Sequence, residues 1–201
     1  MSDSEKPTLL IVDGHSLAYR AFFALPVDSF RTRDGQHTNA IHGFLAMLIN
    51  LIKAEKPTHM AVAFDMSRQS FRTREYPEYK GTRNETPVEF KGQIPLLQEA
   101  LAAMNIVTLQ KEDFEADDIL ATVAVAAEKR GCDVLLATSD KDCRQLISDR
   151  VKIFNLRKQL KYDRESLKTD WGIAPEQVVD FQSLVGDSVD NVKGVPGIGP
   201  K

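Results

Sequence analysis

Three short, almost wholly apolar segments recur along the 201-residue chain, separated by amphipathic stretches. Residues 8–12, 59–64 and 133–138 have the length and composition of buried strands. Residues 40–54, 88–104 and 116–130 carry apolar side chains at helical spacing. Short buried strands that alternate with helices are typical of an α/β fold, in which helices cover both faces of a mostly parallel, twisted sheet.

An aspartate lies at or just beyond the end of each predicted strand, namely Asp13, Asp65 and Asp140. In an open α/β sheet, ligands bind beyond the carboxyl ends of the strands, so we expect these side chains along one edge. One such aspartate alone is most often a helix N-cap or a turn residue. Three equivalent positions favour a shared site.

Six further acidic residues stand in tight groups at Glu115, Asp117, Asp118, Asp142, Asp187 and Asp190. Acids in a first helical turn stabilise the helix dipole, and polar loops alone account as readily for the two later groups. Asp117, however, begins the row of Leu120 and Ala124, so it is expected to point inward, where it needs a positive partner. Brought together, the nine carboxylates would repel one another unless divalent cations such as Mg²⁺ or Mn²⁺ neutralised them. Such ions commonly act on phosphates.

The overall charge is compatible with a nucleic-acid partner. The net charge is −3, but setting the nine carboxylates aside from the 29 acidic residues leaves 20 against 26 basic residues, a balance of +6. No apolar run approaches the roughly 20 residues that span a bilayer, and the polar N-terminus does not resemble a secretory signal. Cys132 and Cys143 lack metal-site spacing and are expected as thiols in a reducing compartment. These features predict a cytoplasmic, nucleoid-associated protein with no membrane contact.

Cations alternate with aromatic residues in the segment 67–91, which includes Arg72, Tyr79, Lys80 and Arg83. This pattern suits phosphate contacts combined with base stacking on a single strand. The alternative is a solvated surface excursion with aromatic anchors.

The last eight residues, which contain Gly194, Gly197, Gly199 and Lys201, resemble the hairpin of a helix–hairpin–helix. Glycines in such a hairpin let backbone N–H groups approach a DNA phosphate. By itself a hairpin of this kind is weak evidence. No Ser/His/Asp arrangement and no thiol nucleophile is evident in the sequence.

In their order along the chain, these motifs resemble the 5′→3′ exonuclease domains of bacterial DNA polymerases I, members of the flap endonuclease superfamily. The resemblance covers about residues 8–201, and departures are small: Cys143 replaces a bulky apolar residue, and Lys193 a common proline. The matching motifs are Val12-Asp13-Gly14, Ala63-Phe64-Asp65, Phe71-Arg72, Tyr79-Lys80-x-x-Arg83, Glu115-Ala116-Asp117-Asp118, Asp140-Lys141-Asp142, Gly186-Asp187-x-x-Asp190-Asn191 and the glycine hairpin.

The resemblance implies a PIN-like 5′-nuclease core over residues 8–174, after a flexible N-terminus at residues 1–7. Within this core it implies a helical arch at about residues 67–91. Residues 175–201 would begin a helix–hairpin–helix (helix-3-turn-helix) module that is truncated here. The chain is therefore expected to be a monomeric fragment of a longer protein, covalently linked there to a polymerase domain.

The resemblance also implies the chemistry, which is cleavage of DNA at a 5′ end, nick or flap with two Mg²⁺ or Mn²⁺ ions. The catalytic residues would be Lys80 and Arg83 on the arch with Asp13, Asp65, Asp117 and Asp140. Arg72 and Tyr79 would contact DNA together with Lys80, Arg83 and the hairpin, and the hairpin would also take a monovalent cation. One ion would be held by Asp13, Asp65, Glu115, Asp117 and Asp118, and the other by Asp140, Asp142, Asp187 and Asp190.

Two other functions remain open on the sequence. A PIN-like ribonuclease also clusters acids on a parallel sheet, although the arch and the hairpin count against it. A DNA-structure-binding module with little activity is the non-enzymatic alternative, and the complete set of carboxylates counts against that.

Overall fold

The computed structural model describes residues 6–199, so Lys201 and residues 1–5 lie outside the described residues. The strands are β1 (Thr8–Asp13), β2 (His59–Ala63), β3 (Val107–Leu109), β4 (Asp133–Thr138), β5 (Val151–Asn155), β6 (Leu160–Tyr162), β7 (Gly186–Asp187) and β8 (Val192–Lys193). The α-helices are α1 (Gly14–Ala24), α2 (Asn39–Glu55), α3 (Phe71–Glu75), α4 (Val88–Lys91), α5 (Gln93–Ala103), α6 (Ala116–Lys129), α7 (Arg164–Trp171) and α8 (Val178–Val185). Three short 3₁₀ helices complete the fold: η1 (Val27–Ser29), η2 (Asp142–Leu146) and η3 (Pro175–Gln177).

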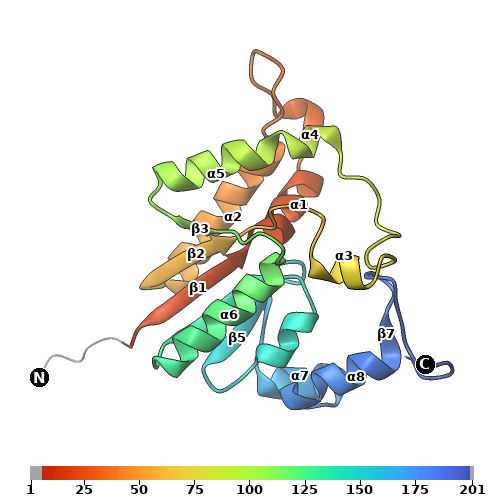
Figure 1. Cartoon of the computed structure of the whole chain (residues 1–201). Helices are drawn as coiled ribbons and strands as arrows, with labels where there is room; N and C mark the ends of the chain where they lie inside the picture. Colours follow the sequence, from red (N-terminus) through yellow and green to blue (C-terminus); the bar gives the residue numbers. More distant parts are fainter. Residues whose placement is uncertain (1–5, 200–201) are drawn as a thin grey trace, which may run out of the picture.

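Six strands form one sheet in the order β3-β2-β1-β4-β5-β6 (Figure 1). All neighbours pair in parallel except β5 and β6, which are antiparallel. The predicted α/β fold with a mostly parallel sheet is therefore confirmed. The chain runs outward from β1 through β2 to β3 and then returns to β4 on the other side of β1. The strand order therefore reverses between β1 and β4, and the carboxyl ends of the strands at such a reversal are the usual place for a ligand in open α/β folds.

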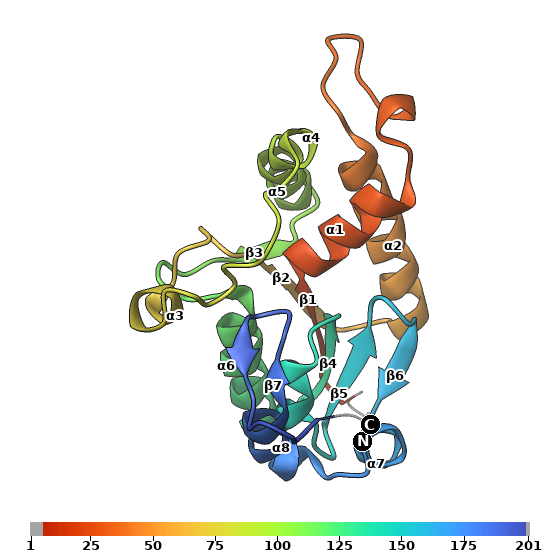
Figure 2. The same ribbon diagram turned by 90° about the vertical axis from the view of Figure 1, so that its right-hand side faces the viewer.

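Helices cover both faces of the sheet, because successive strand residues point to opposite sides. Leu10 and Val12 pack with α1, α2, α4 and α5 in one buried core, while Ile11 between them packs with α6, α7 and α8 in the other. Figures 1 and 2 show these two helical layers on either side of the sheet. Every strand of the sheet centre is thus buried on both faces, which explains its nearly continuous apolar sequence.

The prediction of one continuous helix over residues 88–104 was wrong. Residues 88–104 form two helices, α4 and α5, that meet at Gly92. Pro95 supplies the reason, because a proline has no N–H to donate to the carbonyl of Lys91 one turn earlier. The helix is interrupted at the glycine, and the proline falls in the first turn of α5, where its missing N–H costs nothing.

The arch, residues 67–91, contains the short helices α3 and α4, with turns over residues 77–82 between them. Figure 2 shows α3 standing clear of the sheet beside α6. At the other end of the chain, α8 leads into a two-stranded antiparallel ribbon of β7 and β8 and a turn at residues 196–197. The start of a helix–hairpin–helix module stays a prediction.

Candidate metal centre and the arch beside it

Asp13 joins three elements at the end of β1. Its Oδ1 accepts a hydrogen bond from the backbone N–H of Ser16 at 2.9 Å and so caps α1. Its Oδ2 accepts a hydrogen bond from the hydroxyl of Thr138, at the end of β4, also at 2.9 Å. With 5% of its surface exposed, Asp13 is a helix cap and at the same time a carboxylate held at the carboxyl ends of β1 and β4.

Asp65 and Asp140 lie at the same edge of the sheet as Asp13. The Oδ1 of Asp65 accepts a hydrogen bond from the backbone N–H of Ala116 at 2.6 Å, which ties the segment after β2 to the start of α6. The Oδ1 of Asp140 accepts one from the N–H of Asp142 at 2.8 Å. Because β2, β1 and β4 are neighbours, the three aspartates lie along one edge, as the sequence predicted.

Two carboxylates in this region are held in an environment that disfavours their charge. Burial raises the pKa of Asp117 to about 8, and the nearby charges of Asp140 and Asp13 add to the shift. Burial also raises the pKa of Asp140 to about 6, with Asp142 adding to it. A divalent cation nearby would favour the charged form of both carboxyl groups and offset the burial and repulsion that raise their pKa. The donor set therefore fits a hard divalent ion.

A second group of carboxylates lies at the ribbon. Among residues 6–199, Asp142, Asp187 and Asp190 each offer an oxygen, and these oxygens all lie within 4.8 Å of one another. Oxygen ligands on opposite sides of one Mg²⁺ lie about 4 Å apart, so a small contraction would let the three share an ion. Three of the four predicted ligands of the second ion are thus brought together, and the fourth, Asp140, lies two residues before Asp142 in the same loop.

Two glycines allow the ribbon that carries Asp187. Gly186 has φ +78°, and a Cβ there would lie 2.3 Å from the backbone nitrogen of Gly194. A Cβ on Gly194 would in turn lie 2.3 Å from the carbonyl of Val185. Side chains at either position would push the ribbon open and move Asp187 from its neighbours.

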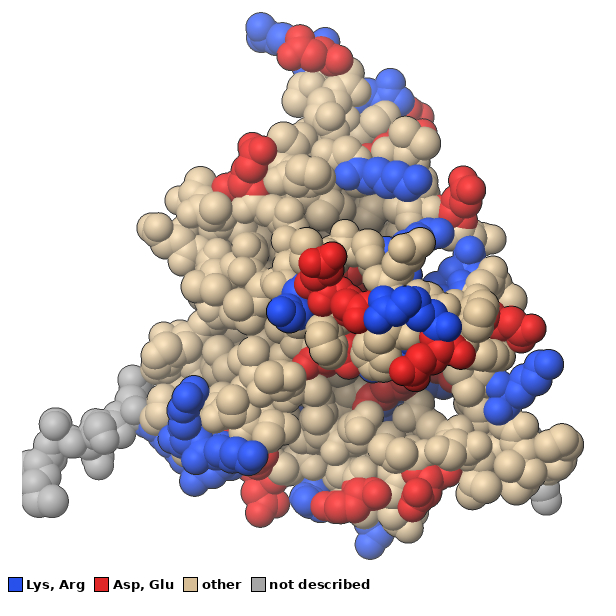
Figure 3. Space-filling model, viewed as in Figure 1, with Lys and Arg blue, Asp and Glu red and all other residues tan. Residues whose placement is uncertain are grey.

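The cations of the arch contact the acidic residues around this centre. Arg72 donates two hydrogen bonds to Asp118, at 2.8 and 2.7 Å. The Nζ of Lys80 lies 2.6 Å from Oε2 of Glu115. Arg83 pairs with Asp190 in the same way, at 2.5 Å. Figure 3 shows the consequence on the surface, where acidic and basic side chains lie side by side over α3 and the start of α6.

Further contacts hold the middle of the arch against the centre. The hydroxyl of Tyr79 lies 3.2 Å from carboxylate oxygens of both Glu115 and Asp190 and can donate to either. The backbone N–H of Lys80, which has φ +55°, donates to the carbonyl of Asp190 at 2.9 Å. The arch therefore bridges the first turn of α6 and the ribbon.

Ion pairing sets the charge state of the carboxylates beneath the arch. Burial by itself would raise the pKa of Glu115, but the hydrogen bond and charge of Lys80 outweigh it and lower that pKa. In Asp118 the hydrogen bonds from Arg72 likewise outweigh burial and lower the pKa. Burial would lower the pKa of Lys80, yet Glu115 raises it on balance. Both members of each pair therefore stay charged.

Comparison with known proteins gives the family. The profile of the 5′-3′ exonuclease N-terminal resolvase-like domain matches residues 8–172. The chain belongs to this exonuclease family. DNA polymerase I of Mycobacterium tuberculosis is 50% identical to it over 203 residues, covering 99% of this chain and 22% of the relative. DNA polymerase I of Bacillus subtilis is 46% identical and is covered to 23% of its length, so the chain spans about a fifth of the curated relatives it matches.

Solved structures share the fold of this exonuclease domain. A bacteriophage T5 protein co-crystallised with metal ions has a TM-score of 0.77 and 26% identity, covering 96% of this chain and 71% of its own. A bacteriophage T5 flap endonuclease, solved as a pseudo-enzyme–product complex with DNA and metal ions, has a TM-score of 0.74 and 25% identity over the same shares of both chains. Over its described residues, the exonuclease domain has no helix that is both long and apolar enough to cross a membrane.

Several residues that donate hydrogen bonds to the predicted metal ligands were not identified from the sequence. Ser70, which is 2% exposed, donates its hydroxyl to Glu115 at 2.9 Å. Thr138 holds Asp13, and Gln182 on α8 donates to Asp142 at 2.5 Å. Thr138 precedes the Asp140 motif by two residues and could have been found from that position. Ser70 and Gln182 carry no such signal.

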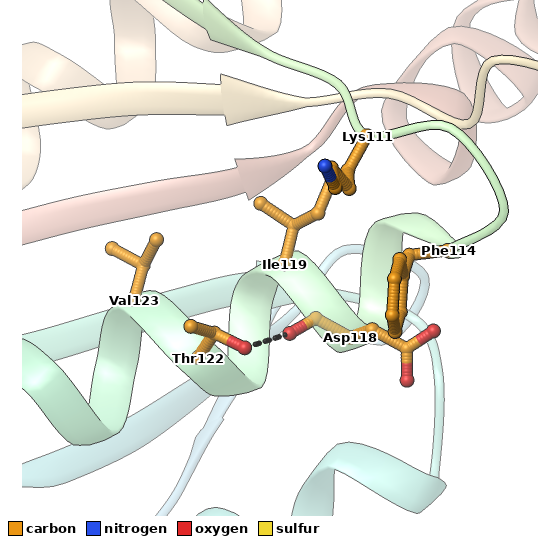
Figure 4. A pocket seen from close by; sticks show the side chains of 6 residues that line it. All are labelled: Lys111, Phe114, Asp118, Ile119, Thr122 and Val123. Carbon is orange, nitrogen blue, oxygen red and sulfur yellow. Dashed lines mark hydrogen bonds between the residues drawn. The ribbon is translucent and has the colours of Figure 1, made fainter.

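Asp118 differs from the other predicted ligands in its surroundings. Both of its oxygens are engaged by Arg72, and Oδ2 also accepts the backbone N–H of Glu115 at 3.0 Å. Figure 4 shows it beside a small pocket of about 240 Å³ lined mainly by apolar side chains, including Phe114 and Ile119. In the exonuclease domain Asp118 thus closes a capping box and holds the arch.

Proposed function

We propose that this domain is a metal-dependent 5′→3′ exonuclease and 5′-flap endonuclease that hydrolyses DNA phosphodiester bonds. The observation that carries the proposal is a carboxylate cluster at the carboxyl edge of the sheet, directly beneath an arch of cations. The names of its relatives, DNA polymerase I and a flap endonuclease bound to DNA and metal ions, support a DNA substrate with a 5′ end, nick or flap.

The proposed ligands fall into two sets. Asp13, Asp65 and Asp117, with Asp140, would hold one ion, and Asp142, Asp187 and Asp190 would hold the other. Asp140, which the sequence assigned to the second ion, is placed with the first because its charge acts on Asp117. Glu115 and Asp118 would support the first set from the arch side. Mg²⁺ is the proposed ion, and a pair of such ions would supply a water of lowered pKa and stabilise the charge that develops on the phosphate.

The protein's own cations would then change partners. Lys80 and Arg83 neutralise Glu115 and Asp190 in the structure. Once divalent ions take over that task, these side chains are available to the scissile phosphate, where they would stabilise the developing charge. Arg72 and Tyr79 would contact the DNA strand beside the scissile phosphate. Binding of the metal ions would therefore increase the affinity for DNA, and binding of DNA would increase the affinity for the metal ions.

The hairpin at the end of the chain would bind the duplex. Among the described residues, nothing lies within 4 Å of the place where a Cβ would be on Gly197, which has φ +84°, or on Gly199. A phosphate would therefore have room to approach this backbone, and a monovalent cation would bind between the hairpin and that phosphate. Gly194 would contribute to this hairpin and also permits the close packing of the β7–β8 ribbon. Lys201 would add a positive charge for the phosphate.

In the longer protein we propose that the domain, residues 8–174, and its DNA-binding region, residues 175–201, are covalently linked to a polymerase. Such a protein would remove primers and repair DNA in the cytoplasm, at the nucleoid, as a monomer. Testing the chain beside the longer protein on one substrate would measure what the additional residues contribute to DNA affinity.

The deciding experiment compares a 5′-flap DNA with an RNA strand of the same sequence, in Mg²⁺ and in EDTA. We expect 5′-phosphate products from the DNA in Mg²⁺, and we expect Asp117→Ala and Asp140→Ala to abolish them while the circular dichroism spectrum is unchanged. Asp163→Asn, at the N-cap of α7, is the control and should cut normally. Normal cleavage by either alanine variant would refute the site, and preference for RNA would favour a PIN-like ribonuclease.

A further inference from the structure

Arg144 is a buried cation in the 3₁₀ helix η2, two residues after Asp142. Its residue surface is 6% exposed. The guanidinium lies 4.1 Å from the ring centroid of Trp171 and 4.6 Å from that of Tyr162, and Nη2 lies 3.1 Å from Asp170. Nη1 is buried without a hydrogen-bond partner among the described residues. An apolar side chain commonly packs in such a place at no loss of stability, so stability alone does not account for this cation.

The contacts of Arg144 lead back to the carboxylate that precedes it. Trp171 ends α7, and its ring packs on that of Phe181 in α8 with centroids 5.3 Å apart. The next residue of α8, Gln182, donates its amide to Asp142. Beyond its last turn α8 continues into β7, which carries Asp187. A closed circuit therefore runs from η2 through α7 and α8 and returns to η2.

We propose that Arg144 is a positioning residue, which sets the spacing of Asp142 against Asp187 and Asp190 by clamping η2 to α7 and α8. The inference rests on the proposed function, because it assumes that these three carboxylates hold a divalent ion. Mg²⁺ demands near-ideal octahedral geometry, so a drift of η2 away from α8 weakens its site. The planar guanidinium can stack on two rings and pair with Asp170 at once, which a lysine cannot do.

The test uses Arg144→Met with Arg150→Met as its matched control. Arg150 also pairs with an aspartate, Asp133, at 3.2 Å, but at the start of β4, the end opposite the carboxylates. Mn²⁺ binding is measured by isothermal titration calorimetry on the whole chain, with thermal unfolding in parallel. We expect Arg144→Met to weaken one of the Mn²⁺ sites by about 10–100-fold, the usual effect of losing a residue that supports a ligand, and Arg150→Met to leave both sites unchanged.

Two milder variants keep the test valid if Arg144→Met does not fold. Arg144→Lys keeps the charge, and Asp170→Asn keeps the shape of the partner; both should weaken the same site by several-fold. In cleavage assays the loss should be in the half-saturating Mg²⁺ concentration, with kcat recovered at high Mg²⁺. Wild-type affinity in the folded Arg144 and Asp170 variants would overturn the inference. Absence of Mn²⁺ binding by the wild-type chain would overturn the proposed function, and the inference with it.

Discussion

Seven of the nine carboxylates at the proposed metal centre form two groups with opposite electrostatic environments, and Asp65 and Asp142 lie outside both groups. The inner group consists of Asp13, Asp117 and Asp140. The rim group consists of Glu115, Asp118, Asp187 and Asp190, and each member pairs with a cation of the chain, in turn Lys80, Arg72, Lys141 and Arg83. In the inner group the pKa of Asp117 and Asp140 is raised, whereas in the rim group the pKa of Glu115, Asp118 and Asp187 is lowered.

The difference assigns a separate task to each region. The inner group is electrostatically unfavourable by itself and gains most from an added divalent ion. The rim group is neutralised by the protein's own cations, three of which lie on the arch, so a metal ion bound there must displace an arginine or a lysine.

Lys80→Met separates the two tasks of a rim cation. The substitution removes the ammonium group that we propose stabilises charge on the scissile phosphate. We therefore expect kcat for flap cleavage to fall by about 10²–10³-fold, as when other electrostatic contacts to a transition state are lost. Mn²⁺ should bind slightly more tightly, because Glu115 no longer has an internal partner. Rapid-quench kinetics and calorimetry measure the two quantities, with the exposed Lys53→Met as control. A fall in Mn²⁺ affinity would contradict the exchange of partners.

Asp117→Asn tests the inner group. An unfolded aspartate has a pKa of about 3.9, and in the fold the pKa of Asp117 is about 8, so the folded protein binds more protons between these values. Its stability therefore falls as pH rises from about 4 to about 8. In EDTA at pH 8 the variant should be more stable by about 2 kcal/mol, which is less than the full shift because neighbouring acids share it. Urea unfolding at pH 4, 6 and 8 checks this, and an equal gain at pH 4 would refute it.

Asp118→Asn tests the rim group and should have the opposite sign. The lowered pKa of Asp118 means that its pair with Arg72 stabilises the fold above the unfolded pKa of about 4 and is lost as pH falls through the folded value. At pH 7 we expect a loss of about 1–2 kcal/mol, and at lower pH the two curves should converge. Urea unfolding at pH 7, with a second series below about pH 4, measures the loss and the convergence. A stabilised variant at pH 7 would remove the distinction between the two regions.

Tyr79→Phe should have the smallest effect. The hydroxyl lies 3.2 Å from carboxylate oxygens of both Glu115 and Asp190, and a hydrogen bond this long to a charged group contributes about 1.5 kcal/mol, the lower end of the usual range. The ring remains, so stacking on a DNA base is expected to persist. Amide hydrogen exchange over the arch should quicken slightly, while the flap dissociation constant stays within about two-fold. A large loss of DNA affinity would mean that the hydroxyl itself contacts DNA.

The sequence predicted the inner group well, because its logic is topological. An aspartate at the end of each parallel strand must lie at the carboxyl edge, and Asp13, Asp65 and Asp140 do. The inward direction of Asp117 followed from its place in the row of Leu120 and Ala124, and its raised pKa agrees with a buried position.

The sequence identified the residues of the rim group but could not predict their ion pairs, because most of the partners are distant in sequence. Arg83 and Asp190 are 107 positions apart, and local pattern carries no information about that pairing. The strands β5 and β6 were also not predicted, since β5 is only partly apolar and β6 is three residues long. Arg144 was missed for a related reason: a charged residue in a polar loop motif gives no sign that it will be buried between two rings.

The most direct test of the two-region account is a crystal structure of the chain soaked in Mn²⁺, with anomalous scattering to locate the ions. We predict one anomalous peak beside Asp13, Asp117 and Asp140 and another beside Asp142, Asp187 and Asp190, with Arg83 displaced from Asp190. No peak at either group, or two peaks with every rim cation still paired, would contradict it.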